Sequence, residues 1–178
     1  GAFDTTTPLL GNRAANDLYF MLDSRGTFGP EMWRTSGIGS DIGFVHDFSG
    51  MLFGEDPPEY LGTPRSLFFR ARDETAGREL WKANPFSQTA RMEADIYPGT
   101  QPGGAPNNGD PEQLVYVEST QTVFFQAINE APTGFNDREL WKFSGSIATQ
   151  VKDINQEASS SPTELTVVGD LVFFRADG

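Results

Sequence analysis

A glutamate two residues before a tryptophan occurs three times in this chain. The copies are "PEMWR" at 30–34 and "RELWK" at 78–82 and at 138–142. Alternate residues of a strand share a face, so each carboxylate is expected beside its indole ring. This pairing could bind sugars, with the ring as a platform and the carboxylate as an acceptor of hydroxyl protons. The structural alternative is that each tryptophan packs between sheets while the glutamate pairs with a nearby arginine. We favour the structural alternative, because a scaffold needs one anchor per copy and an active site does not need three.

A second set of carboxylates recurs at one position of the same pattern. Asp47, Asp95 and Asp153 each precede an apolar residue, 12 to 14 residues after the tryptophan. Three matched carboxylates could converge on a cation, and calcium is the metal that best suits oxygen ligands alone. The structural alternative is a turn cap or an ion pair with a strand arginine such as Arg70 or Arg175. The structural role is favoured; no other cofactor is indicated.

The residues that commonly carry catalysis are scarce. His46 is the only histidine, and the corresponding positions hold Ala94 and Lys152, which indicates a permissive site. The neighbouring Asp47 would point to the opposite side of a strand, so it is a poor partner for a histidine base. The chain has no cysteine, no phosphate-binding glycine loop and no G-x-S-x-G. We therefore expect no enzyme; the alternative is a polysaccharide hydrolase or lyase, since 25 acidic residues always offer some carboxylate pair.

The elements around these residues repeat in a fixed order, which is typical of a tandem-repeat protein. An aromatic run precedes each tryptophan phrase, the Asp pair follows it, and a Pro-x-x-Leu element leads to the next run. The runs are "DLYFML" (17–22), "SLFFRA" (66–71), "TVFFQA" (122–127) and "LVFFRA" (171–176). The predicted anchors of the repeat are Trp33, Trp81, Trp141, Phe20, Phe69, Phe125 and Phe174.

Each unit reads as four short antiparallel strands separated by turns, and no helical period is found. A four-stranded unit of this length is typical of a β-propeller blade. Adjacent Phe-Phe residues point to opposite faces, so both faces of each sheet should be covered. The predicted architecture is an all-β, propeller-like array, with a β-sandwich or a linear solenoid as the alternative. The predicted boundaries are 8–56, 57–110 and 111–161 for three blades and 162–178 for half of a fourth. Such an array is expected to be completed by a longer chain or by an assembly.

The run of elements "LVFFRADG", "RELWK", "VKDI" and "SPTELTVVGDLVFF" resembles the tandem ELWxxDGT repeats of large secreted and surface proteins, mostly bacterial. The resemblance extends over nearly the whole chain and is best over 66–178. The Asp-Gly-Thr turn of that family is missing after Trp81 and Trp141, and Met32 stands where leucine is usual. The resemblance implies a secreted, propeller-like repeat protein with no activity generally assigned, and it supplies no catalytic residue.

Charge and loops limit the partners. The chain has 13 basic and 25 acidic residues and a formal charge of −12, which disfavours nucleic acid and anionic lipid. No apolar run is long enough for a membrane helix.

The predicted function is a non-catalytic extracellular or cell-surface module for adhesion, assembly or binding of protein or glycan, including copies of itself. An accessory subunit of a larger assembly is a further alternative. The predicted contact residues lie in the longest Gly/Pro-rich insert: Gly99, Pro102, Asn107, Asn108 and Asp110.

Overall fold

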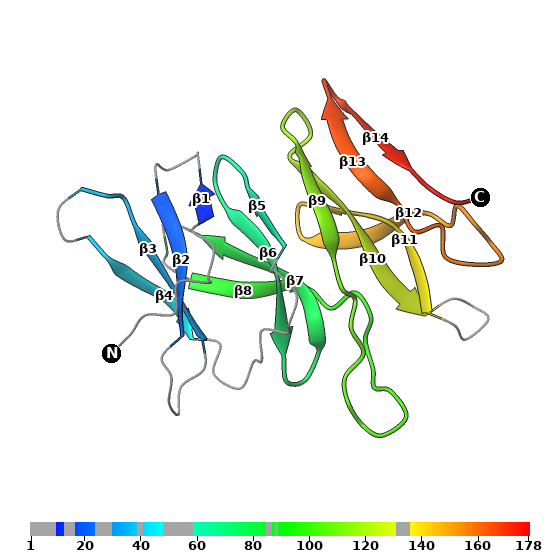
Figure 1. Cartoon of the computed structure of the whole chain (residues 1–178), viewed down its shortest axis with the longest axis horizontal. Coiled ribbons are helices and arrows are strands. Elements are labelled where there is room, and N and C mark those ends of the chain that lie inside the picture. The colour runs from blue at the N-terminus through cyan, green and yellow to red at the C-terminus, as the bar shows by residue number, and fades with distance from the viewer. Residues whose placement is uncertain are drawn as a thin grey trace.

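The computed structural model describes residues 10–12, 17–23, 30–38, 41–47, 59–84, 87, 89–130 and 136–178. These residues form strands and turns, and no helix occurs among them. The all-β prediction is confirmed. The strands make four separate antiparallel sheets, which follow one another in chain order across the molecule (Figure 1).

Each sheet is a meander in which every strand pairs with its neighbours in sequence. The first sheet contains β1 (Leu10–Asn12), β2 (Asp17–Asp23), β3 (Pro30–Thr35) and β4 (Gly43–Asp47). The second contains β5 (Tyr60–Gly62), β6 (Leu67–Asp73), β7 (Gly77–Asn84) and β8 (Thr89–Ala94). The third contains β9 (Glu112–Val117), β10 (Thr122–Glu130), β11 (Asn136–Ser144) and β12 (Ile147–Lys152). The fourth has two strands, β13 (Thr163–Val168) and β14 (Leu171–Arg175).

The three larger sheets repeat the same register around the tryptophan. Trp33 pairs with Phe20, Trp81 with Phe69, and Trp141 with Phe125. In each sheet the pairing with the following strand shifts directly before the tryptophan. This β-bulge bends and twists the strand at the same point every time. The repeat seen in the sequence is thus also a repeat of backbone geometry.

Two apolar cores lie between successive sheets. The first joins Tyr19, Met32 and Val45 of the first sheet to Phe69 and Trp81 of the second. The second core joins residues of the second and third sheets, among them Phe68, Leu80, Phe125, Trp141 and Phe143. Adjacent Phe68 and Phe69 therefore enter different cores, as their alternation along the strand predicts.

The predicted anchors differ in burial according to what covers them. Phe69 and Phe125 are fully buried, and Trp81 and Trp141 nearly so. Phe20 and Trp33 in the first sheet are half-buried. Phe174 is 38% exposed, because the two-stranded fourth sheet has no paired tryptophan strand beside it.

Candidate functional site

The carboxylate of the first "RELWK" phrase is buried in the fold. Glu79 has no exposed surface. Its Oε2 accepts the backbone N–H of Ile96 at 2.7 Å, and its Oε1 accepts the backbone N–H of Gly109 at 2.7 Å. Ile96 follows β8 and Gly109 precedes β9, so one carboxylate holds both ends of the connection between two sheets.

The second phrase repeats this arrangement. Glu139 is also buried, and it accepts the backbone N–H of Ile154 at 3.1 Å and that of Ser160 at 2.9 Å. The Ser160 hydroxyl donates a further bond of 2.6 Å. The hydrogen bonds of both glutamates therefore come from chain connections and a serine. The expectation that these glutamates pair with an arginine is wrong for Glu79 and Glu139.

The arginine before each glutamate fixes the same connections through its backbone. The N–H of Arg78 donates to Asn108 Oδ1, and its carbonyl accepts the N–H of Asp110. In the third sheet the N–H of Arg138 donates to Ser159 Oγ, and its carbonyl accepts the N–H of Ser161. We call the segments 108–111 and 159–162 the straps, because each ties one sheet to the start of the next.

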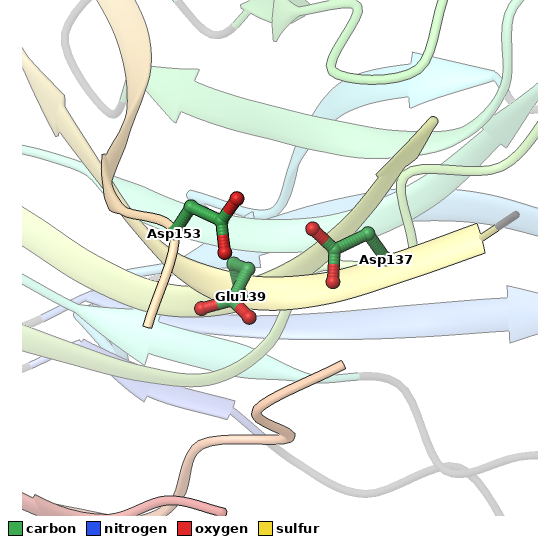
Figure 2. A group of neighbouring side chains, drawn as sticks. All are labelled: Asp137, Glu139 and Asp153. Carbon is green, nitrogen blue, oxygen red and sulfur yellow. The ribbon is translucent and has the colours of Figure 1, made fainter. Parts of the chain in front are cut away.

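One group of three carboxylates lies beside a strap (Figure 2). Asp137, Glu139 and Asp153 each offer an oxygen within 4.8 Å of the others, and they form the one such group found in the described ranges. Asp137 Oδ1 and Asp153 Oδ1 are buried and accept no hydrogen bond from the residues that the structure describes. Burial, and then the charges of Glu139 and Asp153, raise the pKa of Asp137 above its usual value. The group could supply oxygen ligands to a cation or could share a proton.

The predicted calcium residues have different surroundings. Asp153 belongs to the carboxylate group, together with Asp137, which lies in the acidic segment "GFNDRE". Asp95 is exposed, and in the second sheet Gly77 stands where the third has Asp137, so the group is not repeated there. The side chain of Asp47 lies outside the described residues. Arg70, which was expected to pair with such an aspartate, instead pairs with Glu112 of the next sheet at 2.6 Å. Calcium stays a prediction.

The tryptophans are poorly placed as sugar platforms. Trp81 and Trp141 are almost completely buried in the two cores, so neither ring is open to a ligand. Trp33 is half-buried, and its Nε1–H donates to Glu31 at 2.9 Å. His46 lies in β4 opposite Met32 in the register, and its side chain lies outside the described residues.

The insert between β8 and β9 projects from the sheets as a long loop (Figure 1). Its tip is a small hairpin in which Thr100 pairs with Pro106, and its exposed residues run from 98 to 105. Gly99 and Pro102 lie in this exposed part. Asn107 donates through its side chain to the Pro98 carbonyl. The other predicted contact residues belong to the strap: Asn108 accepts from Arg78, and Asp110 makes a bidentate ion pair with Arg78.

A cleft of about 590 Å³ opens between the second and third sheets. Phe68 and Phe143 line it, and their rings meet edge to face at 5.7 Å, with Lys82 Nζ 5.7 Å from the centre of Phe68. Tyr116 and Glu118 also line the cleft. The sequence does not predict this cleft, because its residues come from strands and turns that are far apart in the chain.

The described residues contain no helix able to cross a membrane. Comparison of the chain with protein-family models, with curated proteins and with solved structures finds no match in any of the three.

Proposed function

We propose that this chain is a non-catalytic, extracellular repeat module that serves assembly, adhesion or ligand binding. One observation carries the proposal. The repeated carboxylates, which are the residues most able to do chemistry, are used by the fold: in two sheets Glu79 and Glu139 each accept one backbone N–H from just after the last strand of the sheet and one from the strap that follows. Residues that repeat with the same structural partner are scaffold.

The proposed architecture is a propeller-like array of the ELWxxDGT type. It is supported by the repeated register, by the repeated bulge, and by the contacts between successive first strands, β1 with β5, β5 with β9, and β9 with β13. The formal charge of −12 suits a solvated outer surface. Surfaces that such an array offers to partners are the exposed loop tip and the cleft between sheets.

A second candidate function is polysaccharide cleavage, which the carboxylate group favours. Asp137 and Asp153 lie near each other, and the raised pKa of Asp137 is the property expected of a general acid. Their oxygens, however, lie beside a strap rather than among the residues that line the cleft. We therefore place this candidate second.

One experiment separates the two. The purified chain is incubated with a panel of acidic and neutral polysaccharides, and new reducing ends and unsaturated products are measured next to glycan-array binding and sedimentation. We expect binding or association without turnover, and the same result for Asp137→Asn. If the unmodified chain cleaves a polysaccharide and Asp137→Asn abolishes this cleavage without changing the circular dichroism spectrum, the chain is an enzyme. The proposal of a non-catalytic module would then be rejected.

The loop is tested by deletion of its tip. Removal of 101–105 takes away exposed residues and leaves Asn107 and Asn108 in place. We expect unchanged thermal stability and weaker partner binding. Unchanged binding would exclude the loop as the contact surface.

A further inference from the structure

The fourth sheet presents an apolar face to solvent. Phe173 pairs with Thr166 and Leu171 pairs with Val168, so the four side chains share one face. Phe173 is 56% exposed, Leu171 63% and Val168 59%. Three large apolar side chains on one small sheet face form a patch of the kind that marks a protein contact. We call it the tail face.

The position of Phe173 within its run shows what kind of face this is. In the aligned runs "SLFFRA" and "LVFFRA", Phe173 corresponds to Phe68. Phe68 is buried and packs edge to face on Phe143 of the following sheet. The tail face is therefore the face that, inside the chain, receives the next sheet.

The first sheet presents the matching face at the other end of the array (Figure 1). Trp33 lies opposite Phe44 in the register, and their rings meet edge to face at 5.6 Å. Phe44 is 44% exposed. The other side of this sheet, with Tyr19 and Met32, is covered by the second sheet. We call the side with Trp33 and Phe44 the head face.

Within the chain, a face bearing a tryptophan always packs on the preceding sheet. Trp81 packs on the first sheet and Trp141 on the second. Trp33 occupies the same register position as these two residues. The head face is thus the counterpart of the tail face in both internal interfaces.

We infer that the tail face of one copy of this chain binds the head face of a second copy, continuing the sheet-on-sheet packing between molecules. The inference rests on the proposed function, because it names the partner of the assembly module. The contact is heterologous, so it produces a ring if the rotation closes and a growing filament if it does not. Since each copy carries −12 and the contact is apolar, added salt should strengthen the association by screening repulsion.

Complementation of two variants tests the inference. Phe173→Asp removes the tail face and keeps the head face; Phe44→Asp does the reverse. We expect each variant alone to be monomeric in sedimentation, with association weakened about tenfold or more, and their mixture to form a 1:1 dimer and nothing larger. Ser87→Asp, at an exposed position between β7 and β8 of the second sheet, adds the same charge away from both faces and should associate like the unmodified chain.

Cross-linking of cysteine variants tests the same contact without placing a charge on either face. The chain has no cysteine, so Phe44→Cys and Phe173→Cys each introduce a single thiol. A short thiol cross-linker should join the two variants to each other and should give no covalent dimer from either alone. Covalent dimers of Phe173→Cys alone would overturn the inference in favour of a symmetric contact.

A chain that stays monomeric up to about 100 µM, a weak affinity limit, would also overturn it. That result would leave the proposed function standing if glycan or another protein still bound. Polysaccharide cleavage, by contrast, would contradict the proposed non-catalytic function, whatever the oligomeric state of the chain.

Discussion

Glu79 and Glu139 sit where the chain leaves one sheet and enters the next, and each carries an ionisable group into the interior. Unpaired, a buried carboxylate costs several kcal/mol, so its hydrogen bonds decide whether the position is tolerated. At Glu79 both oxygens accept backbone N–H groups at 2.7 Å. The side chain thus satisfies two donors that the connection could not satisfy by strand pairing.

Replacing Glu79 by glutamine should destabilise the chain. A carboxyl group can accept at both oxygens even when it is protonated, because its O–H can turn away from the two donors. An amide keeps one acceptor but turns its NH₂ toward the N–H of either Ile96 or Gly109, so one buried hydrogen bond is lost and two donors face each other. We expect a loss of about 2 kcal/mol in the free energy of unfolding, measured by urea denaturation. The exposed Glu118→Gln is the control and should be neutral; equal stability of both variants would contradict the role of Glu79.

The same residue predicts a pH dependence of stability. Burial, with a smaller contribution from the charge of Asp95, raises the pKa of Glu79 from 4.5 to about 8, against the lowering effect of its backbone hydrogen bonds. Between these pH values the unfolded chain loses the proton while the folded chain retains it. The stability contributed by this group is therefore complete below pH 4.5 and is lost as pH rises to about 8, by at most about 1.4 kcal/mol per pH unit.

Urea unfolding of the unmodified chain and of Glu79→Gln across this range measures the effect. The difference in unfolding free energy between the two proteins should shrink as pH rises, since glutamine does not titrate. A difference that grows with pH would show that Glu79 is ionised throughout and that its hydrogen bonds outweigh its burial.

At the scale of the element, the straps explain why loop length can vary without changing the sheets. Gly109 lies against Glu79, and the residues inserted before it are displaced into a projecting hairpin. The sequence predicted the insert from its Gly/Pro content. It did not predict that Asn108 to Pro111 belong to the fold, because the bonds that hold them reach back 30 residues to Arg78 and Glu79.

Gly109→Ala tests the strap. An added Cβ would lie 2.6 Å from Glu79 Oε2 and 2.7 Å from Ile96 Cβ, so both the carboxylate and the core residue must shift. We expect a loss of about 2 kcal/mol in thermal unfolding experiments. Gly178→Ala, where a Cβ meets nothing within 4 Å, is the control. If Gly109→Ala is as stable as this control, the strap can shift to accommodate a Cβ without destabilising the fold.

At the scale of the whole molecule, the repeat could be recognised from the sequence because large apolar residues mark the same positions in each unit. Aromatic runs, the tryptophan phrase and the turns predicted an all-β chain and four-stranded units, and the sheets agree with the strand order. The partner of Glu79 was misjudged because a sequence shows nearby arginines but not distant backbone N–H groups. Only part of the carboxylate group could be predicted from the sequence. Asp153 was a candidate because it repeats in each unit, whereas Asp137 occurs in one unit only and lies beside Asp153 only in the folded chain.

Trp81 and Trp33 hold the same register position but differ in what covers them, which gives a test of the array. Trp81 is buried between two sheets, so Trp81→Ala opens a large cavity and should cost about 3–5 kcal/mol. Trp33 lies half-buried on the head face, and Trp33→Ala should cost about 1–2 kcal/mol in a monomer, since less of its surface is removed from water than that of Trp81. Urea denaturation at low protein concentration compares the two. Equal losses would mean that the head face is packed within the chain, and it could then not receive a second copy.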